Sequence, residues 1–346
     1  MAEPAPPTLQ MRLDKGALAE NWRALHRMSG AAEAGAAVKA DAYGLGVDHV
    51  VPALCKAGAR HFFVAHWSEV PQVLAHVEAR YISVLHGPMQ AADAAYARAV
   101  GVRPVLNTPN QVKLWLEGGG GPCHLMVDTG INRLGIAVDE WADPALGRLD
   151  IEILMSHLAS ADEDSALNAV QLGRFHNAAR SIPAKYHSLA NSAGIALGNE
   201  YAFDLTRPGL SLYGGVPRPQ LGNVISQVAY PQAAIIQRRN LSAGDSVGYN
   251  AKFTATSNMN VGIVSVGYAD GYLRSWAGGG ALRSGEAILP LLGQVSMDMV
   301  VVDLAAAPHL KEGDWVDIPY DLPQASRISA LSQYELLTVL GSRYRR

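Results

Sequence analysis

Short apolar runs alternate with longer amphipathic stretches over the first part of the chain. The runs predict buried strands, and the stretches between them have apolar positions at helical spacing. Asp14 can cap the first helix, which has Leu18, Trp22, Leu25 and Met28 on one face. Strands are expected to end at Lys39 and to lie at residues 61–65, 81–85, 102–106, 123–127, 151–155, 186–190 and 203–206. Helices are expected at 47–57, 68–76, 91–99, 109–116, 139–146 and 166–180, with a short one from 192.

This alternation amounts to eight strand–helix units, with the helix after the eighth strand only weakly marked. Eight such units within about 200–250 residues predict an α/β fold, the (β/α)8 barrel. The active site of that fold lies at the carboxyl ends of the strands. Lys39 ends the first strand, so it stands where the fold places chemistry.

The pattern changes near residue 221, where short β-rich runs separated by glycine turns replace the alternation. Runs at 261–266, 287–292 and 299–304 predict strands, and 329–340 is helical in part. We therefore expect a barrel domain at 11–221 and a mostly β domain at 222–346, on which residues 1–10 can pack.

Composition narrows the class of protein. The 346 residues are 49% apolar and 17% charged, which suits a globular protein, and the net charge of −3 gives no reason to expect nucleic acid as a partner. Cys55 and Cys123 form no CxxC pair or metal-ligand cluster, so no metal is expected and a reducing compartment is the simplest interpretation. Without a signal core or a membrane-spanning apolar run, the chain is expected to be cytosolic, with no membrane partner.

Lys39 lies in the stretch Ala36–Gly44, where an apolar run stops at a lysine and a turn follows. An apolar setting lowers the pKa of a lysine, and a neutral lysine can form a Schiff base with a carbonyl. Tyr43 places a hydroxyl near the same strand end. Spacing alone favours the simpler interpretation of a surface lysine after a buried strand.

Further candidates follow the later barrel strands. Arg133, in DTGINRLG, presents a fork of donors suited to a carboxylate or phenolate oxygen, and His157 closes the sixth strand. Taken alone, Arg133 could be a solvated loop arginine and His157 a satisfied core histidine. Ser192 follows the seventh strand, either as an anion site or within an ordinary helix cap, and Arg207 follows the eighth, in DLTRPGL.

Three motifs lie beyond the barrel. Tyr268 stands in VGYADG, where a tyrosine before a glycine turn is usually structural. Met297 stands in GQVSMD, where core packing is the simpler interpretation, and Tyr334 stands in QYE.

Together these motifs resemble those of the alanine racemases, in the same order, from about Leu13 to Arg346. The resemblance implies pyridoxal 5'-phosphate as the cofactor, held by Lys39 as a Schiff base. It assigns the ring nitrogen to Arg207 and a link between the catalytic tyrosine and that arginine to His157. The phosphate would be bound by Ser192, Tyr334 and the backbone amides of Gly209 and Leu210, and Tyr43 would also bind the cofactor. Arg133 and the backbone N–H of Met297 would bind the substrate carboxylate.

The implied activity is racemisation of alanine by two bases, Lys39 on one face of Cα and Tyr268 on the other, supplying D-alanine for peptidoglycan. A tyrosine needs nearby positive charge to act as a base. In the family, a head-to-tail homodimer places the tyrosine of one subunit over the cofactor of the other. The chain departs from many members at Met126, where they carry a carbamylated lysine that supports the arginine; here support would come from elsewhere, for example Asn132.

Other interpretations stay open. A racemase of the same fold could act more broadly, on serine or lysine. A fold-related decarboxylase would carry an acidic residue at the ring nitrogen and a catalytic cysteine, and Arg207 argues against it. A non-catalytic single-barrel protein that binds pyridoxal phosphate would lack residues 222–346.

Overall fold

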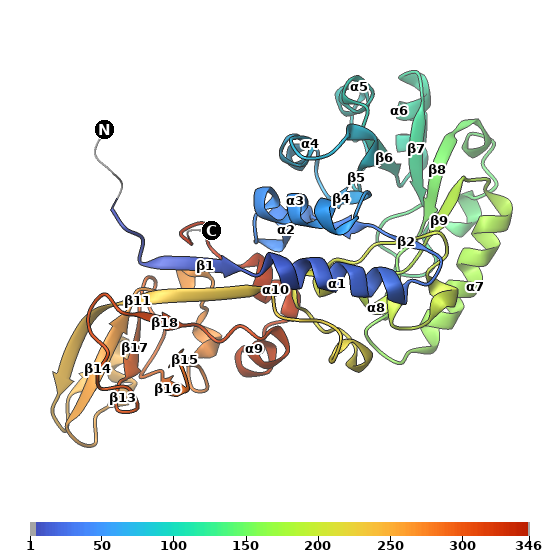
Figure 1. The fold of residues 1–346 in the computed structure, drawn as a ribbon. Helices are drawn as coiled ribbons and strands as arrows, with labels where there is room; N and C mark the ends of the chain where they lie inside the picture. Colours follow the sequence, from blue (N-terminus) through green and yellow to red (C-terminus); the bar gives the residue numbers. More distant parts are fainter. Residues whose placement is uncertain (1–4, 345–346) are drawn as a thin grey trace. The chain divides into compact units, whose positions relative to one another are not determined.

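The computed structural model describes residues 5–344 and contains two compact units (Figure 1). One unit is Lys15–Ser226, and the other combines the chain up to Asp14 with the segment from Gln227 onward.

The larger unit is built on parallel strands. Seven form one sheet, in the order β3 (Ala36–Ala37), β4 (Phe62–Val64), β5 (Ile82–Val84), β6 (Arg103–Leu106), β7 (Pro122–Met126), β8 (Asp150–Met155) and β9 (Tyr186–Ser188). The eighth, β10 (Leu205–Thr206), pairs with β2 (Glu33–Ala34), which leads into β3 through Gly35. On its other side the Arg207 N–H donates to Ala190 O at 2.8 Å. The strands thus close into the predicted (β/α)8 barrel.

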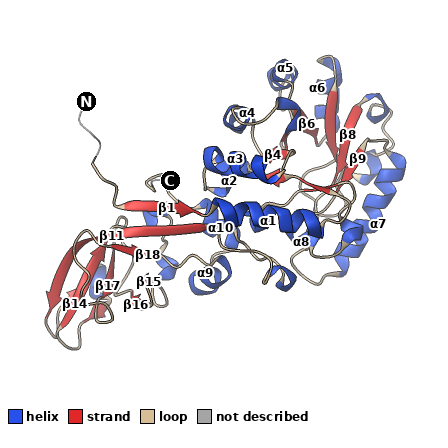
Figure 2. Cartoon of the chain, viewed as in Figure 1, coloured by secondary structure: helices blue, strands red, loops and turns tan. Residues whose placement is uncertain are grey.

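Helices lie outside the barrel strands (Figures 1 and 2). They are α1 (Lys15–Met28), α3 (Val47–Ala57), α4 (Val70–Leu74), α5 (Ala91–Val100), α6 (Pro109–Glu117), α7 (Ala166–Ser181) and the short α8 (Ser192–Ile195). The α1 helix precedes the first strand and buries the predicted apolar face, including Leu18, Trp22 and Leu25. Strand residues of the barrel such as Phe62 are fully buried, each contributing about 1.5–3 kcal/mol.

The prediction of a helix at 139–146 is wrong. Only two 3₁₀ turns form there, Val138–Glu140 and Leu146–Arg148. Pro144 lies between them; it lacks an N–H group and keeps Asp143 out of helical conformation, so a regular helix cannot continue. After β10 the chain likewise forms only a 3₁₀ turn, Leu210–Tyr213.

The smaller unit is mostly antiparallel sheet. Its strand order is β16 (Ala287–Pro290), β15 (Ala281–Ser284), β18 (Trp315–Asp317), β11 (Ala229–Leu241), β14 (Met259–Val264) and β17 (Val300–Asp303), and β1 (Leu9–Leu13) also pairs with β11. A small hairpin, β12 (Ser246–Val247) with β13 (Phe253–Thr254), and the helices α9 (Leu322–Ser329) and α10 (Gln333–Thr338) complete it. The predicted runs near 261, 287 and 299 correspond to β14, β16 and β17.

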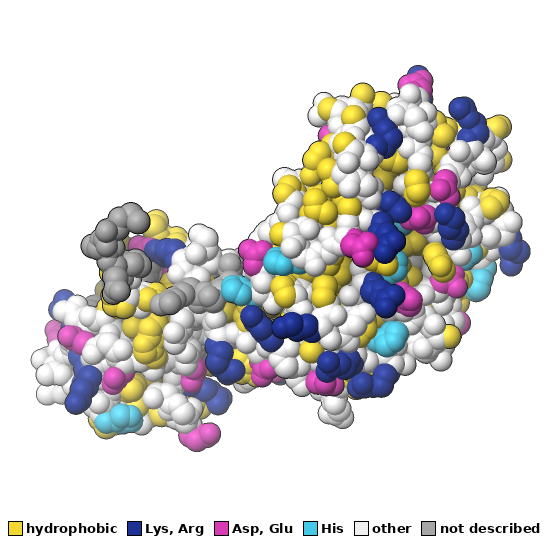
Figure 3. All heavy atoms as spheres, turned by 45° about the horizontal axis from the view of Figure 1, so that its top comes forward, with side chains coloured by type: hydrophobic (Ala, Val, Ile, Leu, Met, Phe, Trp, Pro, Cys, Tyr) yellow, Lys and Arg dark blue, Asp and Glu magenta, His cyan; other side chains and the backbone are white. Residues whose placement is uncertain are grey.

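Charges of both signs are interspersed on the face of the barrel unit seen in Figure 3. Within residues 5–344, no helix is both long and apolar enough to cross a membrane. The same described residues contain no group of three His, Cys, Asp or Glu side chains that could hold a metal ion.

Candidate active site

Lys39 lies at the carboxyl end of the first barrel strand, half-buried. The regular strand ends at Ala37, two residues earlier than predicted, and Lys39 begins the turn α2 (Lys39–Tyr43). Burial is the main cause that lowers the pKa of Lys39, and the charges of Arg133 and Arg207 lower it further, while Glu69 opposes them. A lowered pKa favours the neutral amine, which is the nucleophilic form.

The turn after Lys39 is left-handed. Ala40, Asp41, Ala42 and Tyr43 have φ values between 52° and 56°. Each such residue other than glycine costs roughly 1–2 kcal/mol, so other contacts must stabilise the turn. This turn directs the Tyr43 ring against Tyr213, with ring centroids 4.8 Å apart.

A carboxylate from the next unit of the barrel holds the left-handed turn in place. Glu69 accepts hydrogen bonds from the backbone N–H of Ala40 and, with its other oxygen, from Ala65 and His66. Asp41 stabilises the end of the turn by accepting from the Val47 N–H at 2.8 Å. Sequence reasoning missed Glu69, because its role depends on a contact across 29 residues.

Arg133 lies on an exposed loop after β7. One oxygen of Asp128 accepts hydrogen bonds from three backbone N–H groups of this loop, those of Gly130, Ile131 and Asn132, at 2.8–3.2 Å. Position 135 requires glycine, because a Cβ there would lie 2.6 Å from the backbone nitrogen of Asp128. These contacts explain the Asp and Gly positions of the motif.

Two residues of α7 support the Arg133 loop and were not predicted. Gln171 is fully buried and donates to Thr129 Oγ1 at 3.1 Å and to His157 O at 3.0 Å. Arg174 donates to Thr129 O at 3.0 Å. The Asn132 backbone N–H donates to Asp128, and support of Arg133 by the Asn132 side chain stays a prediction.

Arg207 is buried at the end of β10 without a carboxylate partner among the described residues. Its guanidinium donates to Ser188 Oγ, Ser156 O and Leu189 O, and burial lowers its pKa to about 10.

Burial, aided by Arg207, lowers the pKa of His157 to about 3, so His157 is neutral at pH 7. Arg207 bonds the carbonyl beside His157, not its ring, so the proposed link through His157 stays a prediction.

A cradle for an anionic group lies beside Tyr43. The Ser192 hydroxyl accepts from the Gly209 and Ser211 N–H groups at 3.0 and 3.2 Å. A Cβ at Gly209 would lie 2.3 Å from Tyr43 Oη, so only glycine leaves room for that hydroxyl. Ser211 Oγ is buried and has no hydrogen-bond partner within the described residues.

These residues fit the phosphate of pyridoxal 5'-phosphate. The hydroxyls of Tyr43 and Ser192 both lie at the Gly209 turn, and a phosphate bound there would accept hydrogen bonds from such groups. The Gly209 and Ser211 N–H groups donate to Ser192 Oγ, and binding of the phosphate by the Gly209 and Leu210 amides stays a prediction.

The remaining predicted residues lie in the smaller unit. Tyr268 is half-buried, with the Arg274 guanidinium 5.2 Å from its ring centroid. Met297 is 53% exposed and Tyr334 43% exposed. Their exposure leaves them accessible to a ligand or to another chain.

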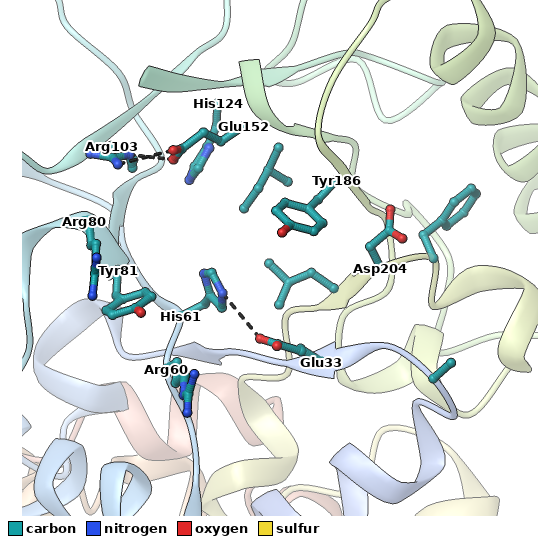
Figure 4. Close-up of a pocket in the computed structure, with 14 residues that line it drawn as sticks. Glu33, Arg60, His61, Arg80, Tyr81, Arg103, His124, Glu152, Tyr186 and Asp204 are labelled. Carbon is teal, nitrogen blue, oxygen red and sulfur yellow. Dashed lines mark hydrogen bonds and ion pairs between the residues drawn. The ribbon is translucent and has the colours of Figure 1, made fainter. Parts of the chain in front are cut away.

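A separate cavity of about 520 Å³ lies at the amino ends of the barrel strands, the end opposite Lys39 (Figure 4). Its charged groups pair largely with one another: Arg103 binds Glu152 with two nitrogens, at 2.6 and 3.3 Å, and His61 lies 3.5 Å from Glu33. His124 lines the same cavity, and burial lowers its pKa to about 3. We interpret these pairs as structural, because the active site of this fold lies at the opposite end of the barrel, where the strands have their carboxyl ends.

Comparison with known families accounts for nearly the whole chain. The family described as "Alanine racemase, N-terminal domain" matches residues 13–217, and "Alanine racemase, C-terminal domain" matches residues 228–346. An alanine racemase of Methylobacterium nodulans is 41% identical over 97% of this chain and 95% of its own length. A biosynthetic and a catabolic alanine racemase of Agrobacterium fabrum are each 38% identical.

Solved structures agree. Alanine racemase from Bartonella henselae, with covalently bound pyridoxal phosphate, is 33% identical and has a TM-score of 0.90 over 99% of both chains. Biosynthetic alanine racemase from Pseudomonas aeruginosa is 31% identical, with the same TM-score and coverage.

The cradle generates a first prediction. Gly209→Ala should displace the Tyr43 hydroxyl and weaken pyridoxal phosphate binding by at least about tenfold, equivalent to one charge-assisted hydrogen bond. Titration of the apoprotein, followed by absorbance, measures the affinity. Gly147→Ala is the control, because a Cβ there meets nothing within 4 Å. Unchanged affinity in Gly209→Ala would contradict the cradle.

A second prediction concerns acid stability. His124 stays neutral in the folded state down to about pH 3, whereas an unfolded histidine takes up a proton below about pH 6.5. The free energy of unfolding should therefore fall as pH decreases from 6.5, by roughly 1.4 kcal/mol per pH unit for this group. Urea midpoints at pH 7 and pH 5 measure the decrease. It should be smaller in His124→Gln than in the wild type or in His309→Gln, an exposed control; an equal decrease in all three would refute the assignment.

Proposed function

The chain belongs to the alanine racemase family, and we propose that it interconverts L-alanine and D-alanine with two bases, Lys39 and Tyr268. Pyridoxal phosphate, when bound, supplies the electron sink that makes the Cα proton of the substrate acidic. The observation that carries the proposal is the position of Lys39. It lies at the same strand ends as the Ser192 cradle, and its pKa is lowered there. Lys39 would hold the cofactor and then remove or return the proton on one face of Cα.

A racemase needs a second base, because one rigid base tends to return the proton to the same face. We assign that role to Tyr268, in the smaller unit. Arg133 would bind the substrate carboxylate through its fork of donors, together with the Met297 N–H. We further propose a head-to-tail homodimer in which the smaller unit of one subunit completes the barrel site of the other, with Tyr334 reaching the phosphate.

Arg207 would face the pyridine nitrogen. A fixed cation there disfavours a proton on that nitrogen and so weakens the electron sink. Negative charge then stays closer to Cα, where Lys39 or Tyr268 can reprotonate it. His157, which is neutral, would lie between Arg207 and Tyr268 and link the tyrosine to the positively charged arginine.

The alternatives to this proposal differ from it in the amino acid that the pocket accepts or in the metabolic role of the enzyme. Identity is 38% to both a biosynthetic and a catabolic relative, so identity alone does not choose between these roles. We propose the biosynthetic role, supply of D-alanine for peptidoglycan. A serine or lysine racemase is the second candidate. Because Met126 stands where many members have the modified lysine, activity would not require dissolved carbon dioxide.

The assay that tests the function uses purified holoenzyme with L-alanine, L-serine and L-lysine, read by chiral chromatography. We expect D-alanine to form fastest, and borohydride to attach the cofactor irreversibly to the peptide that contains Lys39. Lys39→Ala should lose at least about 10³-fold in rate, as expected when a nucleophile and base is removed. Lys56→Ala is the matched control. Labelling of a different lysine, or faster turnover of serine or lysine, would overturn the corresponding part of the proposal.

The shared site is tested by mixing two inactive variants, Lys39→Ala and Tyr268→Phe. In a mixed dimer one site combines both defects, while the other combines intact Lys39 from one chain with intact Tyr268 from the other. Subunit exchange should therefore restore activity in proportion to the fraction of mixed dimers. Verified mixed dimers that stay inactive would show that both bases come from one chain.

A further inference from the structure

Two segments of the smaller unit carry the residues that the proposed function places over the substrate. We call residues 267–271 the tyrosine segment and residues 296–298 the carboxylate segment. Backbone hydrogen bonds of 3.0 Å join them, from the Tyr268 N–H to Ser296 O and from the Ala269 N–H to Met297 O. The position of Tyr268 is therefore coupled to that of Met297.

A buried carboxylate lies beneath the tyrosine segment. The Asp270 side chain is 1% exposed, and its Oδ2 accepts a hydrogen bond from the Gly267 N–H at 3.0 Å. One N–H does not compensate for the burial of a charge, which needs a close cation with good geometry. The tyrosine segment therefore depends on whatever cation Asp270 binds.

That cation is Arg343, near the C-terminus. Its Nε and Nη2 donate to the two Asp270 oxygens at 2.6 and 2.8 Å, in the fork geometry that arginine prefers. Its remaining nitrogen, Nη1, donates to Asp298 Oδ1 at 2.7 Å. The Gly341 N–H adds a 3.3 Å bond to Asp270 O. One guanidinium thus joins the tyrosine segment to the carboxylate segment.

We propose that Arg343 is a positioning residue, which fixes the distance between the Tyr268 hydroxyl and the Met297 N–H by binding Asp270 and Asp298 at once. The proposal rests on the roles assigned to Tyr268 and Met297. Because the substrate is held by its carboxylate while a proton moves at Cα, an error in this distance misaligns the base. Misplacement by about 1 Å can reduce a rate by roughly 10²-fold.

Hydrogen exchange tests the bridge without reference to activity. In Arg343→Gln, amide exchange should accelerate in both the tyrosine and the carboxylate segments, in apoprotein and holoenzyme alike. In Asp298→Asn, which leaves the Asp270 pair intact, the increase should be confined to the carboxylate segment. Arg239→Gln, an exposed arginine on β11, is the control and should leave both segments unchanged. No acceleration in either segment of a folded Arg343→Gln protein would overturn the proposal.

Kinetics test its consequence. In Arg343→Gln we expect kcat/KM for alanine to fall by about 10- to 100-fold while cofactor affinity is unchanged. Racemisation has an equilibrium constant of one, so the fall must be equal in both directions. The isotope effect of α-deuterated alanine, however, should rise in the direction in which Tyr268 removes the proton and fall in the other. A general structural defect would not produce that asymmetry.

Arg343→Lys serves as the conservative variant and as the alternative should Arg343→Gln fail to fold. An ammonium can approach Asp270 but cannot form the fork and reach Asp298 as well, so its effects should be intermediate. Wild-type kinetics in Arg343→Lys together with wild-type exchange would refute a role for the fork. A wild-type protein that does not racemise alanine would instead refute the proposed function, and the exchange comparison would still decide whether the bridge exists.

Discussion

The burial of Arg207 with no carboxylate partner among residues 5–344 is the constraint on which the site depends. Desolvating a guanidinium costs several kcal/mol, and the hydrogen bonds that compensate it within the described chain go to neutral oxygens at the ends of β8 and β9. Burial is the main cause that lowers the pKa values of Lys39 and His157, and the Arg207 charge lowers both further. The pocket is therefore positive before any ligand binds, and a phosphate and a carboxylate would supply the missing negative charge.

This constraint also explains the supporting contacts. A site with several cations near one another tends to spread apart, because like charges repel. Glu69 and Asp128 counter this by accepting hydrogen bonds from backbone N–H groups of the loops after β3 and β7; Glu69 reaches its loop from the next unit of the barrel, whereas Asp128 belongs to the loop that it fixes. Gln171, on α7, donates hydrogen bonds to both the loop after β7 and the loop after β8. The cations are thus held by a rigid backbone, with little direct charge pairing between their side chains and acids.

The barrel fold and the order of the functional motifs along its strands could be predicted from the sequence, because apolar periodicity and motif position are local properties. Lys39 and Arg207 were expected at strand ends and Arg133 in the loop after the fifth strand, and each lies close to its expected place. Ser211 and Glu69 could not be predicted, because nothing near them in the chain indicates the groups they meet. The helix expected at 139–146 failed for a local reason, since one proline outweighed a weak periodic signal.

The left-handed turn after Lys39 has a consequence for the order of folding. Four residues that each oppose this conformation cannot form it alone, so the turn must wait for Glu69 and for Tyr213, which follows the last barrel strand. Until the barrel closes, Lys39 belongs to an ordinary solvated chain segment. Its amine then has an ordinary pKa and is mostly protonated at pH 7, so it reacts more slowly with free aldehydes. A nascent or misfolded chain would therefore capture the cofactor more slowly at Lys39, and rapid capture would report that the barrel is complete.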